Sequence, residues 1–169
     1  KRVRQAFYQA IDVNAINKSV MRGLSVPTAI NLPNPDRAGI PKDMDKRYPH
    51  DVAAAKRLLA EAGYPNGFEV TLDCPNNRYI NDEKICVALA GMWAQLKLKI
   101  KVNAMPRATY FPKLEKLDTS LYMLGWGGSI TDAETTFTPI YRNRGAGGVG
   151  SYNYGNYTDD KLDAVAAAQ

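Results

Sequence analysis

The stretch that decides the fold is Phe68-Glu69-Val70-Thr71-Leu72-Asp73, where apolar and polar residues alternate as they do in a strand. A helical pattern follows over residues 81–96, and a second alternating stretch runs from Lys99 to Ala104. Residues 110–117 have the apolar spacing of another helix. Leu121-Tyr122-Met123-Leu124 is then nearly continuous apolar sequence, typical of a strand buried on both faces. This order predicts an α/β fold: a mostly parallel sheet with flanking helices, joined by right-handed crossovers.

Further helices are expected outside this core. Their apolar spacing predicts them at residues 3–11, 12–23 and 51–63, and from residue 159 or 160 to the end. Asp51 is the expected N-cap of the third. Residues 24–49 are rich in proline and predict a long irregular segment, of a kind that is often functional. Residues 145–150 predict a glycine-rich loop.

The composition is that of a soluble globular chain, with 45% hydrophobic and 23% charged residues. No apolar run reaches the roughly 18 to 20 residues that cross a bilayer. The net charge is +5, but the basic residues are spread among acids, which argues against a nucleic-acid partner. No apolar secretion signal follows Lys1-Arg2-Val3-Arg4, so either the protein is cytosolic or its start has been removed.

The two cysteines, Cys74 and Cys86, leave two alternatives open. They are too few for a disulfide scaffold, and they lack the partners of a zinc site. They are either two free, partly buried thiols or one disulfide that ties a strand end to the following helix in an oxidising compartment. The sequence favours neither alternative over the other.

Polar residues follow each predicted strand. Because the carboxyl ends of parallel strands share one edge, where ligands bind, these loops are expected to form a recognition surface. A guanidinium has a planar fork that matches a carboxylate, so the surface is predicted to bind a polar, anionic group. The candidate ligand-binding residues are Asn77, Arg78, Tyr79, Arg107, Trp126, Gly127, Gly128, Ser129 and Asp132.

Ordinary structural roles compete with this interpretation. Arg78 could be a solvated loop arginine, and Arg107 a surface residue at a helix start. Trp126 could belong to the core, since buried indoles are common. Gly127 and Gly128 could serve only a turn, and they match no dinucleotide-binding fingerprint.

Catalysis finds little support in the sequence. The single histidine, His50, stands at a helix start, and nothing places a nucleophile beside it. The acid pair Asp132/Glu134 stands at a helix N-terminus, where the helix dipole explains it. No calcium-loop spacing occurs. We therefore expect no catalytic residue, no metal site and no cofactor.

Four blocks resemble a known family. They occur in the family's order and cover essentially the whole chain. The blocks are Val3-Arg4-Gln5-Ala6-Phe7 with Ala10-Ile11-Asp12, the stretch from Ala55 to Phe68, Leu124-Gly125-Trp126-Gly127-Gly128, and Tyr152-Asn153-Tyr154. They resemble the family 5 solute-binding proteins, which include the dipeptide-, oligopeptide- and nickel-binding proteins of ABC importers.

The resemblance implies a type II periplasmic-binding-protein-like clam-shell that holds its ligand between two lobes. Residues 1–169 would be a single domain, the C-terminal (second) lobe of a larger protein, truncated at both ends. The expected location is periplasmic or otherwise extracytoplasmic. The expected partners are a small-molecule or peptide ligand and the permease subunits of an ABC transporter, with no direct membrane span. The fragment itself is expected to be monomeric and to bind ligand weakly.

The resemblance also assigns roles to single residues. Arg78 falls where dipeptide-binding relatives place an arginine that pairs with the peptide carboxylate, and Trp126 falls in the family's Gly-Trp pocket loop. Peptide binders have an aspartate for the ligand's α-amino group where this chain has Ser129. Asp132 stands where the family usually has a helix-capping acid. A carboxylated solute without that ammonium, or a modified peptide, therefore fits better than a free peptide N-terminus. The alternatives are an opine, a metal chelate or an oligosaccharide and, outside this class, a small hydrolytic enzyme.

Overall fold

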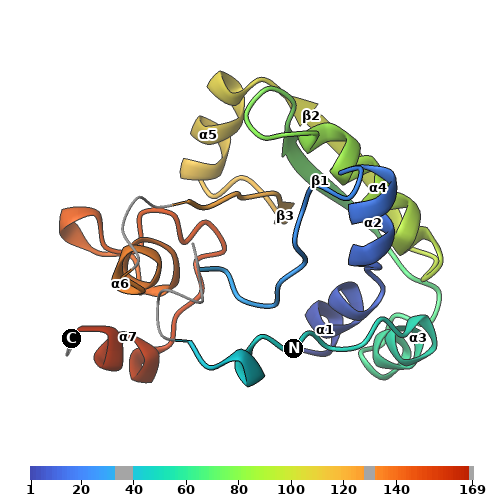
Figure 1. The fold of residues 1–169 in the computed structure, drawn as a ribbon, viewed down its shortest axis with the longest axis horizontal. Coiled ribbons are helices and arrows are strands. Elements are labelled where there is room, and N and C mark those ends of the chain that lie inside the picture. The colour runs from blue at the N-terminus through green and yellow to red at the C-terminus, as the bar shows by residue number, and fades with distance from the viewer. Residues whose placement is uncertain (33–39, 128–131, 168–169) are drawn as a thin grey trace. The chain divides into compact units, whose positions relative to one another are not determined.

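The structure, a computed structural model, describes residues 1–32, 40–127 and 132–167 (Figure 1). The predicted site residues Gly128 and Ser129 lie outside these ranges. The chain forms two compact units. Unit 1 comprises Lys1–Pro27, Arg47–Tyr110 and Ser120–Met123, and unit 2 comprises Thr28–Lys46, Phe111–Thr119 and Leu124–Gln169. Among the described residues, no helix has both the length and the apolarity needed to span a membrane.

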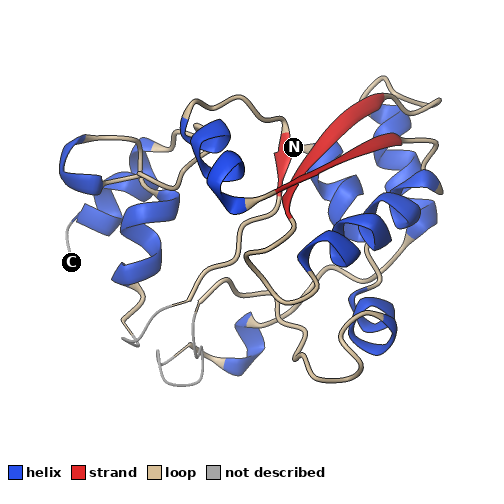
Figure 2. Cartoon of the chain, turned by 90° about the horizontal axis from the view of Figure 1, so that it is seen from above, coloured by secondary structure: helices blue, strands red, loops and turns tan. Residues whose placement is uncertain are grey.

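Unit 1 is built on a parallel sheet, drawn in red in Figure 2. Its strands lie in the order β2-β1-β3, with bounds Glu69–Pro75 for β1, Lys99–Met105 for β2 and Leu121–Tyr122 for β3. β1 pairs with β2 from Glu69↔Lys99 to Pro75↔Met105, so both strands end at the same edge. The predicted α/β class with a parallel sheet is confirmed.

The third strand is shorter than the predicted stretch 121–124. Only Leu121 and Tyr122 pair with β1, and both are half-buried rather than buried on two faces. The N–H of Met123 still donates to the Asp73 carbonyl oxygen of β1 (3.2 Å), but the Met123 carbonyl oxygen accepts the Tyr110 hydroxyl (2.6 Å), and the regular pairing goes no further than Tyr122.

Helices pack around the sheet within unit 1. Their bounds are Arg2–Gln9 for α1, Val13–Ser19 for α2, Val52–Glu61 for α3 and Asp82–Ala94 for α4, and α5 (Arg107–Glu115) begins here. Asp51 caps α3 as predicted, because its carboxylate accepts the Ala54 N–H at 2.8 Å. The buried core is mostly apolar and consists of Ala6, Ala10, Ala55, Leu59, Leu72, Cys74, Cys86, Trp93, Leu96 and Leu98.

The turn before β1 requires glycine. Gly67 has φ +69°, and a Cβ there would lie 2.1 Å from the Lys97 carbonyl oxygen. This close approach lets the Lys99 N–H donate to the Phe68 carbonyl oxygen at 2.9 Å, which starts the β1–β2 pairing. The glycine in the Pro65-Asn66-Gly67-Phe68 block therefore has a backbone role.

Unit 2 consists of short helical turns and one longer helix. They are the 3₁₀ turn η1 (Lys42–Met44), α6 (Glu134–Thr136), the π-helical turn η2 (Phe137–Tyr141), the 3₁₀ turn η3 (Ala146–Gly148) and α7 (Asp160–Ala167). The predicted glycine-rich loop contains η3, with positive φ at Gly147, Gly148 and Gly150. Asp159 caps α7 by accepting the Leu162 N–H at 3.1 Å.

A buried side chain of Asn153 holds the segment before α7. Its amide donates to the carbonyl oxygens of Arg142 (3.1 Å) and Tyr157 (2.7 Å), and its oxygen accepts the Tyr157 N–H (3.1 Å). These bonds tie the backbone at Arg142 and Tyr157 to the buried Asn153 side chain. The asparagine of the Tyr152-Asn153-Tyr154 block thus has a structural role.

The fully buried Tyr110 joins the ends of two strands. Its hydroxyl donates to the Met123 carbonyl oxygen at 2.6 Å and lies 3.3 Å from the Asp73 carbonyl oxygen. Burial raises the pKa of Tyr110 well above its ordinary value, so the hydroxyl stays protonated.

Removing this hydroxyl is expected to destabilise the protein. In Tyr110→Phe the Met123 carbonyl oxygen loses its donor in a buried site, which costs about 1–2 kcal/mol of unfolding free energy. Urea unfolding measures the change. Tyr64→Phe is the matched control, because Tyr64 is 45% exposed. Equal losses in the two variants would contradict the assigned role.

Candidate ligand-binding site

The first candidate loop, residues 75–81, leaves β1 and enters α4; we call it the Arg78 loop. A disulfide between Cys74 and Cys86 joins the end of β1 to α4 across its base, with both cysteines fully buried. Of the two alternatives that the sequence left open, the structure contains the disulfide. The bond encloses the whole Arg78 loop, which limits how far its two ends can separate.

The side chain of Asp82 holds the middle of the Arg78 loop. One carboxylate oxygen accepts the backbone N–H groups of Arg78 and Tyr79, each at 2.9 Å. The other oxygen accepts the Glu83 N–H at 2.9 Å. Burial raises the pKa of Asp82, but these backbone N–H groups lower it by more, so the pKa lies below its ordinary value. The residue is therefore a carboxylate at neutral pH.

The loops that follow β1 and β2 lie side by side at the carboxyl edge of the sheet. The Asn76 N–H donates to the Met105 carbonyl oxygen at 3.0 Å, and the Arg107 N–H donates to the Asn77 side-chain oxygen at 2.8 Å. The structure thus brings Asn77 and Arg107 together as predicted. Their contact, however, involves the backbone of Arg107 and not its guanidinium.

The guanidinium of Arg78 is exposed at this edge. Its central carbon lies 4.9 Å from the centre of the Tyr79 ring, a distance at which a cation is attracted to an aromatic face. Within the described ranges, no salt bridge engages Arg78. A fork of N–H donors is therefore available to a carboxylate.

An open hollow of about 610 Å³ borders the Arg78 loop. It is lined by Asn76, Tyr79, Asn81, Asp82, Glu83, Lys84 and Val87. Most of the lining side chains end in polar groups, although their apolar parts also contribute to the surface, and Lys84 adds a positive charge beside the carboxylates of Asp82 and Glu83. This hollow gives a polar solute room next to the loop.

Unit 2 holds the other described candidates, Trp126, Gly127 and Asp132. The Trp126 ring packs edge-on against Tyr152, with centroids 5.0 Å apart, and Tyr152 packs against Tyr154 at 5.8 Å. The indole N–H of Trp126 is buried and finds no hydrogen-bond partner among the described residues. Gly127 is exposed. The carboxylate of Asp132 accepts the Glu134 N–H at 2.8 Å, which is the helix-capping role that the family resemblance suggests.

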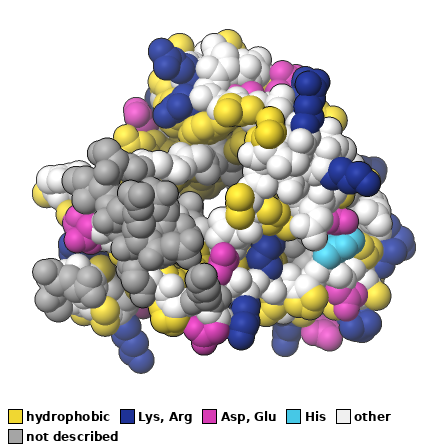
Figure 3. Space-filling view, in the orientation of Figure 1, with side chains coloured by type: hydrophobic (Ala, Val, Ile, Leu, Met, Phe, Trp, Pro, Cys, Tyr) yellow, Lys and Arg dark blue, Asp and Glu magenta, His cyan; other side chains and the backbone are white. Residues whose placement is uncertain are grey.

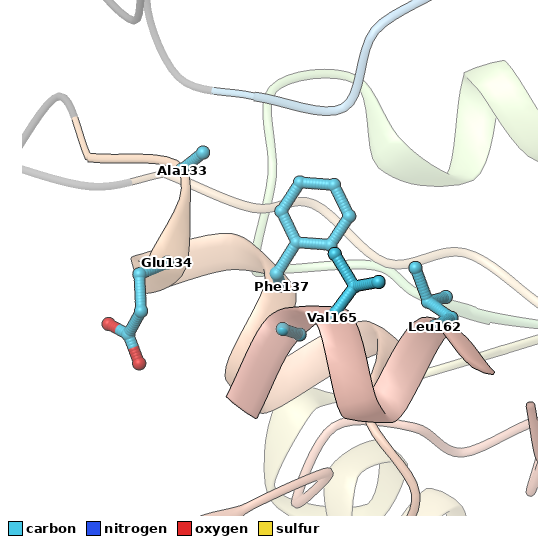
Figure 4. A pocket seen from close by; sticks show the side chains of 6 residues that line it. Ala133, Glu134, Phe137, Leu162 and Val165 are labelled. Atoms are coloured by element: carbon cyan, nitrogen blue, oxygen red, sulfur yellow. The ribbon is translucent and has the colours of Figure 1, made fainter. Parts of the chain in front are cut away.

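Another pocket, which lies in unit 2, is lined by none of the predicted site residues. It has a volume of about 140 Å³ and is lined by Ala133, Glu134, Phe137, Leu162, Val165 and Ala166. Figure 4 shows the Phe137 ring beside Val165 of α7, while the Glu134 carboxylate points away from that ring. The pocket is therefore an apolar crevice beside α7 and lacks the donors that a carboxylate needs.

Among the described residues, acidic and histidine side chains do not gather into a candidate metal site. Within the part of the chain that the structure describes, no group of three or more His, Cys, Asp or Glu residues could hold a metal ion. The single histidine lies among mixed acidic and basic side chains in Figure 3. Its Nδ1 atom is 4.0 Å from a carboxylate oxygen of Asp12, at the start of α2.

The fold places the chain in the class of periplasmic binding proteins. It superposes with a TM-score of 0.84 on the binding protein AgaA of A. tumefacien R10, solved in complex with agropinic acid. The two sequences are 30% identical, and the match covers 99% of this chain and 33% of AgaA. The predicted fold class, that of a periplasmic binding protein, is confirmed.

Residues 1–148 match the middle region of the bacterial extracellular solute-binding proteins, family 5, and the chain belongs to this family. The predicted family and the predicted extracytoplasmic location are confirmed. The chain is similar to heme-binding protein A of Haemophilus influenzae, with 28% identity over 97% of the chain. It is also similar to the glutathione-binding protein GsiB of Pectobacterium atrosepticum, with 31% identity over 83% of the chain. It spans only 30% and 27% of the length of these two relatives.

Two residues of this region were not predicted from the sequence. Asp82 lies at the start of the helix predicted over residues 81–96. Its bonds back to the loop were not predicted, although a carboxylate directly after a loop commonly accepts the loop's N–H groups. Tyr152 was expected, with Trp126, to favour a non-peptide ligand, but its packing on Trp126, which joins positions 26 residues apart, was not predicted. No local pattern predicts such a pair.

Proposed function

We propose that the complete protein is the substrate-binding component of an ABC-type importer and is not an enzyme. Residues 1–169 form its second lobe, and the ligand is a peptide-like or other small carboxylated solute held between two lobes. The observation that carries this proposal is the exposed guanidinium of Arg78 at the carboxyl edge of the parallel sheet, which no salt bridge engages within the described residues. Family membership supports the transport role, and the permease subunits of the transporter are the expected partners.

The names of two relatives support a carboxylated ligand. One relative is a glutathione-binding protein and another was solved with agropinic acid. Both molecules carry carboxylates that a guanidinium fork can bind. The Arg78 loop supplies this fork beside a polar hollow of about 610 Å³.

A non-peptide solute is the second candidate. The aromatic cluster of Trp126, Tyr152 and Tyr154 favours it, because rings and a buried indole N–H without a described partner suit a ligand with flat or hydroxylated surfaces. Opines, metal chelates and oligosaccharides belong to this group. For an opine, Arg78 would still bind a carboxylate.

A ligand panel on the full-length protein tests the proposal. Agropinic acid and glutathione, a modified peptide, are expected to raise the melting temperature, since a ligand at a hundred times its Kd stabilises a protein by about 2.7 kcal/mol. A free dipeptide is expected to raise it less, because Ser129 stands where peptide binders have an aspartate for the α-amino group. The matched control is a peptide with an amidated C-terminus, which is expected to bind at least about tenfold more weakly because it lacks the carboxylate. Equal binding of the two forms, or a shift with an oligosaccharide alone, would contradict a carboxylate ligand. Turnover of a bound probe, followed by mass spectrometry, would contradict a pure binding protein.

A further inference from the structure

We infer that Asp82 is a positioning residue for ligand binding: its buried carboxylate fixes the backbone from which Arg78 projects. The inference rests on the proposed function, because it assumes that Arg78 contacts the ligand. Asp82 itself is 4% exposed, lies at the first residue of α4, and directs both oxygens to backbone N–H groups. It therefore acts on a ligand only through the loop.

The direction of these bonds distinguishes Asp82 from an ordinary helix cap. A capping side chain accepts N–H groups two or three residues downstream, as Asp51 does with Ala54. Asp82 accepts the N–H groups of Arg78 and Tyr79, which lie four and three residues upstream in the loop. Its hydrogen bonds thus order the Arg78 loop more than they order α4.

Other described contacts hold the ends of the Arg78 loop. The disulfide fixes the two ends, and Asn76 and Asn77 bond to Met105 and Arg107 at the sheet edge. The Arg78 side chain itself lies over the Tyr79 ring. With the backbone of Arg78 already ordered, less conformational entropy is lost when the guanidinium binds an anion.

Only a side chain with two accepting oxygens can satisfy all the N–H donors that meet at Asp82. Three N–H donors converge on its two oxygens, and both oxygens accept. In Asp82→Asn, one oxygen becomes an NH₂ group that faces an N–H donor, so at least one donor is left buried without a partner. The substitution preserves size while removing this convergence, which makes it the informative variant.

The test compares two isosteric variants of the full-length protein. Calorimetry with glutathione is expected to show about a tenfold loss of affinity for Asp82→Asn, from the added cost of ordering the loop. Asp51→Asn is the matched control, since it weakens a helix cap far from any candidate ligand residue and should change affinity less than twofold. Urea unfolding of both variants separates lost stability from lost affinity.

A double-variant cycle tests whether Asp82 acts through Arg78. In an Arg78→Ala background, Asp82→Asn should cause no further loss of affinity, because the residue that it positions is gone. An equal loss in both backgrounds, or a comparable loss in Asp51→Asn, would overturn the inference. If Arg78→Ala alone leaves glutathione binding unchanged, the proposed role of Arg78 fails instead.

Amide hydrogen exchange gives a readout that needs no ligand. The N–H groups of Arg78 and Tyr79 are expected to exchange faster in Asp82→Asn than in the wild type and the Asp51→Asn control, because the acceptor that protects them is altered. Unchanged exchange of these two amides would overturn the positioning role, whether or not glutathione binds.

Discussion

Replacing Arg78 with alanine is expected to weaken the binding of a carboxylated ligand by about a hundredfold. A charge-assisted hydrogen bond contributes about 1.5–3 kcal/mol, and a loss of about 2.7 kcal/mol corresponds to a factor of 100 in Kd. The guanidinium is exposed, and within the described ranges no salt bridge competes for it. Calorimetry of the full-length protein with glutathione, or with the best ligand of the panel, measures the effect.

Two further variants show whether the fork or only the charge matters. Arg78→Lys keeps the positive charge but loses the planar pair of donors, so it should recover only part of the affinity. Arg57→Ala removes an exposed arginine of α3 and should leave Kd unchanged. If Arg57→Ala weakens binding as much as Arg78→Ala does, the ligand responds to overall charge and not to this site.

Breaking the Cys74–Cys86 disulfide is expected to lower the unfolding free energy by about 3 kcal/mol. The cysteines are 12 residues apart in the sequence, and the chain-entropy estimate for a closed loop of this size is close to that value. Urea unfolding with and without a phosphine reductant measures the loss without any mutation. The double variant Cys74→Ala/Cys86→Ala should show a similar loss and no longer respond to reductant.

A thiol count provides the control for this prediction. In denaturant without reductant the wild type should show no reactive thiol, and after reduction it should show both cysteines. Two reactive thiols before reduction would mean that the bond is absent. A reductant-independent unfolding curve in a disulfide-bonded protein would contradict the stabilising role instead.

Much of unit 1 follows from local patterns. The alternation over residues 68–73 and 99–104 predicted two strands that the structure pairs in parallel over Glu69–Pro75 and Lys99–Met105. Side-chain alternation is a property of each strand alone, so it is visible in the sequence. The predicted strand over residues 121–124 is longer than the observed β3, and its end is set by the Tyr110 hydroxyl of α5, which donates to the Met123 carbonyl oxygen.

The candidate site was predictable only in outline. Parallel strands bring their following loops to one edge, so Asn77 and Arg107 were expected to be neighbours, and they are. The contacts that each side chain makes were not predictable from the sequence. Asn77 accepts the Arg107 N–H, Asp132 accepts the Glu134 N–H, and Tyr152 packs against Trp126. Such assignments depend on the path of the chain in space, which local spacing does not encode.

The sequence by itself determined the family, the α/β class and the edge of the sheet at which Arg78 stands, because periodicity and motif order are local properties of the chain. Only the tertiary structure decided between free thiols and the Cys74–Cys86 disulfide, since that choice depends on whether the two side chains meet. It also decided that the Asp82 carboxylate turns back to the N–H groups of Arg78 and Tyr79. A buried carboxylate goes where donors converge, and that convergence exists only after the loop has closed between β1 and α4.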